Sequence, residues 1–244
     1  MKSQLKDDIS FWTGFYNDEN CFSWASNKAY LDMNRTMTFR EIPKDDSQKE
    51  KNRIEELRRE WRDEGTNIIR EHARIHNIDF TKWHKTVCNK LIEIYGNDKL
   101  VKKENNKRTE QSTTLTYGQA QKWLNMTLKY LWLLNRLELI NDETSTFIQT
   151  YEKSFHIPLD SYILRYVAKQ DKNTREKFVS TNNNSLDGDI DFSDFWVLFG
   201  SAWSHIDNPD NYYEYQERLA TAITKGCPLE WELVHWHKAI KYYG

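Results

Sequence analysis

The sequence contains few of the residues that interrupt or cross-link a chain: four Pro, eight Gly and three Cys in 244 residues. Because Pro and Gly often end helices and form tight turns, their scarcity favours long helices joined by few turns. Cys21, Cys88 and Cys227 form no Cys-x-x-Cys motif and no cluster with histidine. We therefore expect reduced thiols, with neither a disulfide framework nor a zinc site.

Long apolar runs and a strong charge of one sign are also missing. No apolar stretch approaches the roughly 18 residues that a membrane-spanning helix needs, and residues 1–8 are too polar for a signal peptide. The 35 basic and 37 acidic residues leave a net charge of -2. This balance excludes a uniformly basic nucleic-acid coat but allows a local basic cleft. We expect a cytoplasmic protein without a membrane partner, whose oligomeric state the sequence leaves open.

Apolar residues recur at helical spacing along most of the chain, and we find neither a repeat nor a convincing strand alternation. The pattern predicts one or two short helices within 9–35 and further helices at about 44–75, 79–96, 117–134, 142–151, 160–167, 193–206, 209–225 and 228–242. Polar residues 97–113 and 171–191 are predicted to be connecting loops, the first being a flexible connector or a phosphate-contacting loop.

These elements predict an all-α, compact, multi-helix globular protein. The length fits a single domain, 1–244, or two helical lobes formed by 1–96 and 112–244.

The most apolar predicted helix, 117–134, carries a polar face. Lys122, Asn125 and Lys129 are spaced three and four positions apart, which puts them on one side of a helix. A buried and unpaired ammonium group is costly, so these two lysines need either acidic partners or a chemical task.

Lys122 and Asp160 form the sharpest candidate pair. An apolar environment disfavours the ammonium form of a lysine, which makes the free amine available as a nucleophile. Asp160 follows the extended approach that Pro158 imposes, so its direction is fixed. The alternative is that Lys122 extends to solvent while Asp160 merely caps its helix.

Two segments carry a resemblance to a known family: Gly118-Gln119-Ala120-Gln121-Lys122 and His156-Ile157-Pro158-Leu159-Asp160-Ser161. Over about 112–170 the chain resembles the helix-hairpin-helix DNA glycosylases, and the spacing is similar to the archaeal 8-oxoguanine DNA glycosylase branch. The resemblance implies a helix-hairpin-helix glycosylase-like fold, with Lys122 as nucleophile, Asp160 as its helper, and DNA or a nucleoside-containing ligand as partner. The chain departs from the family in lacking the Leu-Pro-Gly-Val-Gly hairpin, of which only Gly118 remains.

Further residues are candidates for contact with such a substrate. They are Gln121, Asn125, Lys129 and His156 beside the pair, and Trp203 and Asp207 further along the chain. Trp203 and the tryptophans of 228–242 could stack on a flipped base, with His205 or Asp207 reading its edge. The histidines and tryptophans of these helices are equally interpretable as residues at the border of the core.

Residues 183–194 resemble a single EF-hand loop. Oxygen donors are supplied by Asn183, Ser185, Asp187, Asp189, Asp191 and Asp194, around a central Gly188. The first and last positions depart from the usual Asp and Glu, and no partner loop is present. Ca²⁺ binding and an acidic loop that caps the next helix are the two interpretations, and no other metal or cofactor is implied.

Two alternatives to a glycosylase remain. Arg70-x5-His76 is compatible with the signature of HEPN-type ribonucleases, although the same residues suit a solvated charged helix. The second alternative is a non-catalytic interaction protein, such as a regulatory or defence-related binding protein. In that case Lys122 and Lys129 would simply pair with acids such as Asp160 or Glu138.

Overall fold

The computed structural model describes residues 18–40, 48–75, 77–96, 99–104, 107–140, 142–168, 203–223 and 226–243. These residues are mainly helical, which confirms the all-α prediction. The helices are α2 (Asp18–Asn34), α3 (Gln48–Ala73), α4 (Phe80–Ile94), α5 (Tyr117–Arg136), α6 (Asp142–Tyr151), α7 (Ser161–Ala168), α10 (Pro209–Ala222) and α11 (Pro228–Tyr243), with the short 3₁₀ helices η1 (Glu152–Ser154) and η2 (Trp203–His205).

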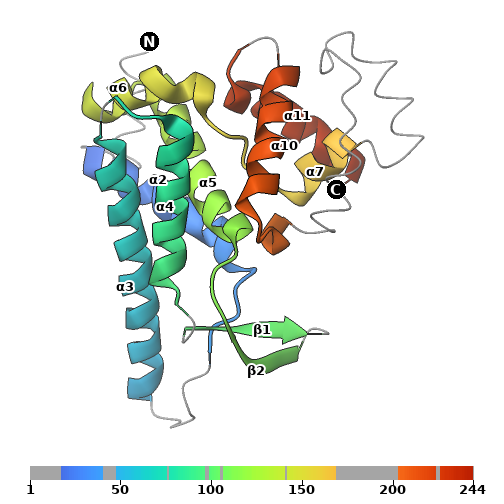
Figure 1. The fold of residues 1–244 in the computed structure, drawn as a ribbon. Helices are drawn as coiled ribbons and strands as arrows, with labels where there is room; N and C mark the ends of the chain where they lie inside the picture. The colour runs from blue at the N-terminus through green and yellow to red at the C-terminus, as the bar shows by residue number, and fades with distance from the viewer. Residues whose placement is uncertain are drawn as a thin grey trace.

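Helix α5 lies at the centre of the molecule (Figure 1). Helices α2, α3 and α4 pack on one side of it, and α7, α10 and α11 lie on the other. Every residue from Tyr117 to Lys129 is buried, including the whole polar face. The predicted helix 117–134 is therefore the central helix of the core, and its polar residues must be satisfied inside the protein.

Local interactions and backbone conformation explain where α5 begins and ends. Thr116 forms a capping box with Gln119: its Oγ1 accepts from Gln119 N, and Gln119 Oε1 accepts from Thr116 N. The helix ends after Arg136, where Glu138 adopts a φ of 58°. The chain then turns towards α6.

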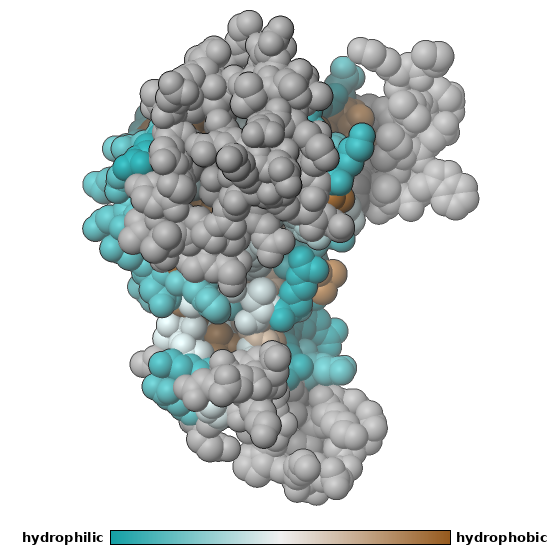
Figure 2. Space-filling view, turned by 90° about the vertical axis from the view of Figure 1, so that its right-hand side faces the viewer, coloured by the Kyte–Doolittle hydropathy of each residue, from teal (hydrophilic) through white to brown (hydrophobic). Residues whose placement is uncertain are grey.

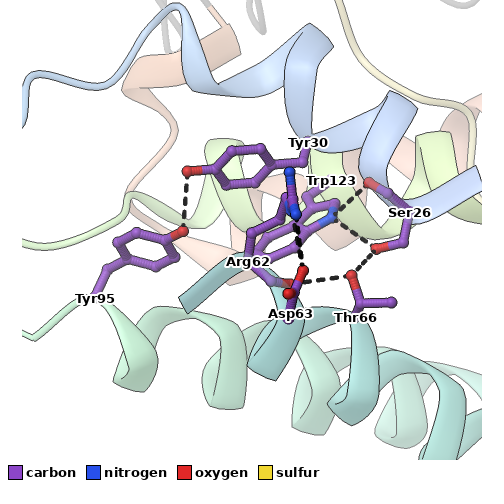
Figure 3. Close-up of polar contacts among 7 residues, drawn as sticks. All are labelled: Ser26, Tyr30, Arg62, Asp63, Thr66, Tyr95 and Trp123. Atoms are coloured by element: carbon purple, nitrogen blue, oxygen red, sulfur yellow. Dashed lines mark hydrogen bonds and ion pairs between the residues drawn. The ribbon is translucent and has the colours of Figure 1, made fainter. Parts of the chain in front are cut away.

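Trp123 of α5 forms hydrogen bonds with α2 and packs against α3 (Figure 3). Its Nε1 donates to Ser26 O at 3.2 Å and to Ser26 Oγ at 3.1 Å, and Ser26 Oγ lies 2.8 Å from Thr66 Oγ1. A Cβ atom at Gly65 would lie 2.1 Å from the Trp123 ring. Helix α3 can therefore approach the indole only because position 65 has no side chain.

Residues 97–113 are not the predicted loop. They contain an antiparallel hairpin of β1 (Leu100–Glu104) and β2 (Lys107–Thr113), seen at the bottom of Figure 1. An isolated hairpin is marginal in water, but this one receives support from outside. Val101 N donates to Thr38 O at 2.9 Å, and Phe39 forms a bridge with Leu100.

The predicted first residues of α4, α10 and α11 agree with the structure to within one residue. Asp79 caps α4 by accepting from Lys82 N at 3.1 Å, and Pro209 and Pro228 occupy the first positions of α10 and α11. Residues 193–202 of the predicted helix 193–206 lie outside the described residues, and Trp203–His205 forms a 3₁₀ turn.

Several predictions fall outside the described residues: the loop 171–191, the Ca²⁺ loop of Asn183 to Asp194, and His76 of the ribonuclease-like pair. Within the described part of the chain, none of the helices is long and apolar enough to cross a membrane.

Candidate functional site

Lys122 and Asp160 lie together. Lys122 Nζ is 3.6 Å from Asp160 Oδ2, and only 7% and 16% of the two side chains are exposed. Asp160 Oδ2 also accepts from Trp236 Nε1 at 2.9 Å, while Oδ1 caps α7 by accepting from Ile163 N at 2.8 Å. The carboxylate therefore has both of the roles that the sequence suggested, as a cap and as a partner of the lysine.

The surroundings of Lys122 disfavour its charged form. Burial lowers its pKa, and the positive charge of Lys129 acts in the same direction, whereas the charges of Asp160 and Glu232 oppose the shift. The Trp203 ring centroid lies 5.7 Å from Lys122 Nζ. Lys122 does not extend into solvent, and it has an aromatic neighbour and a fixed carboxylate.

A second ion pair lies farther along the same face of α5. Lys129 Nζ is 2.5 Å from Glu232 Oε2 of α11, and the two side chains are 9% and 1% exposed. Burial raises the pKa of Glu232, against the effect of Lys129. The predicted partner Glu138 is wrong, because that residue is exposed in the turn after α5.

Asn125, between the two lysines, joins three elements. Its Nδ2 donates to Gln121 Oε1 at 2.9 Å and to Tyr212 Oη at 2.8 Å. Its Oδ1 lies 2.9 Å from His84 Nε2, and Gln121 Nε2 donates to the Gly118 carbonyl at 2.8 Å. Gln121 and Asn125 are completely buried, so their polar groups serve the protein's own network.

The network fixes where the protons of His84 lie. Burial lowers the pKa of His84 to about 4, so the ring is neutral near pH 7. Because Asn125 Oδ1 can only accept, the ring proton is on Nε2, and Nδ1 accepts from Tyr213 Oη at 2.9 Å. Tyr213 Oη in turn accepts from Tyr117 Oη at 2.7 Å.

The same reasoning applies to His156. Tyr212 Oη accepts from Asn125 Nδ2, so its own proton is directed to His156 Nδ1, 3.0 Å away. Burial and the neighbouring His84 ring, whose centroid is 4.5 Å away, hold the pKa of His156 well below its usual value. His156 is therefore neutral, with its proton on Nε2.

Gly118 has a packing role at the start of α5. Its N–H donates to Ile206 O at 2.8 Å, and a Cβ at this position would lie 1.9 Å from Trp203 O. The turn 203–206 can therefore sit directly on α5, and this contact brings the Trp203 ring to Lys122.

Asp207 and His205 face a different space. They are exposed and line a cleft of about 330 Å³ between the hairpin and the start of α5, with Lys102 and several threonines. In Figure 2, pale and brown surface shows in the lower half of the view, on the side of the molecule turned to the viewer. Lys122 is not among the described residues that line this cleft.

Sequence reasoning missed His84, Tyr212 and Glu232, which bind the polar face of α5. The signal for His84 was available: Phe80, Val87 and Leu91 place it on the apolar stripe of α4, where a polar residue requires partners. Glu232 likewise lies between Leu229 and Trp236 at helical spacing.

No group of three or more His, Cys, Asp or Glu side chains is arranged to hold a metal ion within the described ranges. Comparisons with protein-family models, with curated proteins and with solved structures give no match. The functional argument therefore rests on the geometry of α5 and its partners.

Proposed function

We propose that the protein is a DNA N-glycosylase that removes a modified base, such as 8-oxoguanine, through an amine nucleophile on Lys122. The observation that carries the proposal is the buried pair of Lys122 and Asp160, separated by 3.6 Å although far apart in sequence. The lowered pKa of Lys122 supports a supply of the neutral amine.

The reaction assigns a task to each group. The Lys122 Nζ lone pair forms a bond to the sugar C1′ while the bond from C1′ to the base breaks, and the base leaves with that electron pair. A proton from Nζ passes to Asp160 and then to the ring oxygen O4′ as the sugar opens, which leaves a C1′=N Schiff base. Trp203 supplies an aromatic surface beside the amine.

Borohydride trapping tests the proposal, because it reduces the C1′=N bond to a stable covalent link. The substrates are one duplex with an abasic site and one with 8-oxoguanine. We expect an adduct with the wild-type protein and none with Lys122→Arg, which keeps the charge opposite Asp160 but cannot form a Schiff base. Lys129→Arg, in the second buried pair of α5, is the matched comparison and should still give the adduct.

A second function, a non-catalytic binding protein on the same helices, is favoured by one observation. Each carboxylate oxygen of Asp160 already accepts a hydrogen bond, Oδ2 from Trp236 and Oδ1 from Ile163. This is expected if the ion pair of Lys122 and Asp160 only stabilises the core. Under this reading a folded protein gives no adduct with either duplex. An adduct that persists in Lys122→Arg would exclude Lys122 as the nucleophile.

A further inference from the structure

A second concave site borders the polar network at His156 and Gln216, which both contact Tyr212 Oη. A hollow of about 280 Å³ is bounded by the start of α4, the segment 153–157 and the last turns of α10. Its apolar wall includes Phe80, Phe155, Leu219, Ala220 and Ile223. Neither Lys122 nor Asp160 belongs to its described lining, so the hollow is distinct from the candidate active site.

Most hydrogen-bonding capacity at the back of this hollow is already used. Gln216 accepts from Ile157 N at 3.1 Å and donates to Ile157 O at 2.8 Å. Its second amide hydrogen points to Tyr212 Oη at 3.4 Å. The Gln216 side chain therefore binds the backbone of Ile157 and has no donor left for a ligand.

His156 is different, because one of its two nitrogens is unused. Nδ1 accepts from Tyr212 Oη on the inner side, and the proton lies on Nε2, at the other edge of the ring. Among the described residues Nε2 has no hydrogen-bond partner, and it is not a fully buried, unsatisfied polar atom. His156 is partly exposed and lines the hollow. The hollow thus has one fixed N–H donor set among apolar and aromatic side chains.

The charges at the rim restrict the ligand further. The exposed charged side chains there are Lys153, Asp79 and Glu217, one cation and two anions, beside the exposed hydroxyls of Thr81 and Ser154. This balance offers no site for an anion, and a cation would face the neutral ring of His156 at the back.

The geometry points to a binding site for a small, flat, uncharged heteroaromatic molecule that accepts a hydrogen bond from His156 Nε2. The volume suits one or two fused rings, and an apolar wall with a few polar groups is the usual composition of small-ligand sites. The site does not depend on glycosylase activity.

Quinoline and indole are suitable probes, because they have similar size and shape but opposite hydrogen-bonding character. Quinoline has a ring nitrogen that accepts, whereas indole can only donate. Titration of the ¹⁵N-labelled full-length protein should show saturable quinoline binding, with shift changes at Ile157, Leu219 and Ala220. Indole should bind about fivefold more weakly, the ratio that one neutral hydrogen bond contributes.

Ala220→Phe tests the location, because Ala220 is an exposed residue of α10 whose enlargement fills the hollow without removing a core side chain. We expect quinoline affinity to fall at least about tenfold, the effect of losing most of the apolar contact. Lys90→Phe, an exposed substitution on α4 outside the hollow, should leave binding unchanged. No saturable binding of quinoline, equal binding of indole, or unchanged binding in Ala220→Phe would each overturn the proposal.

Discussion

Lys129 Nζ and Glu232 Oε2 lie 2.5 Å apart with almost no exposure to solvent, so α5 and α11 meet through a buried charge pair. Such a pair has paid a large desolvation cost, and its net contribution relative to apolar residues can be near zero. Removing only one partner is strongly destabilising, because the remaining charge is left buried and uncompensated.

Lys129→Met should therefore destabilise the protein by about 3–5 kcal/mol, measured as the free energy of unfolding in urea. The double variant Lys129→Met/Glu232→Leu should recover much of that loss. Lys28→Met is the matched control, because Lys28 pairs with Asp32 at 4.0 Å and is half exposed. Its effect should stay within about 1 kcal/mol. Equal losses in both single variants would contradict the buried-pair account.

The buried histidines predict acid destabilisation at mildly low pH. In the unfolded chain His84 titrates near 6.5, whereas burial lowers its folded-state pKa to about 4. Between these values the unfolded state binds a proton that the folded state does not, so stability is complete above pH 6.5 and falls as the pH decreases towards 4. The pKa of His156 is shifted in the same direction and adds to the slope.

Urea unfolding at several pH values between 7.5 and 5 measures this slope. Each histidine should contribute up to about 1.4 kcal/mol per pH unit. His84→Gln should lower the slope by one proton even if it lowers the stability at every pH. A slope that His84→Gln leaves unchanged would show that other groups cause the acid sensitivity.

Gly65→Ala should destabilise the protein although alanine is the better helix former by about 1 kcal/mol. The added Cβ would lie 2.1 Å from the buried Trp123 ring, which is held by hydrogen bonds to Ser26. We expect a net loss of about 2 kcal/mol or more in urea. In a Trp123→Leu background the same substitution should cost less, and purely additive effects would contradict the contact.

Gly118→Ala should separate the turn 203–206 from α5, because the new Cβ would overlap the Trp203 carbonyl. Hydrogen exchange of the residue 118 amide, which donates to Ile206 O, should become faster. Gly226→Ala is a useful comparison. It strains a backbone with φ of 81° but should leave the residue 118 amide protected. Unchanged protection in Gly118→Ala would argue against direct packing.

The sequence was sufficient for those parts of the molecule that depend on local patterns. Helical spacing predicted α5, and the motif around Pro158 indicated that Asp160 lies beside Lys122. In the structure, Lys122 Nζ and Asp160 Oδ2 are 3.6 Å apart. The predicted roles of Gln121, Asn125, Lys129 and His156 towards a substrate stay predictions, because the hydrogen bonds and the ion pair of these residues lie within the protein.

Non-local contacts could not be read in the same way. The hairpin at 100–113 depends on pairing with the 38–40 segment. Apart from the buried Leu100 and Val101, its strands are polar, so the sequence shows no alternation of apolar and polar residues. Choosing Glu232 rather than Glu138 as the partner of Lys129 requires knowing which helix crosses α5. In both cases the deciding partner is distant in sequence.

Asp160 divides its two oxygens between different neighbours, one towards the Ile163 amide and one towards Lys122 and Trp236. Asparagine can reproduce the first contact but carries no negative charge, and glutamate carries the charge on a longer stem. A saturation library at this codon should consequently sort into ranks: most replacements lose the fold, Asn keeps the fold but loses the borohydride adduct proposed for Lys122, and Asp alone keeps both.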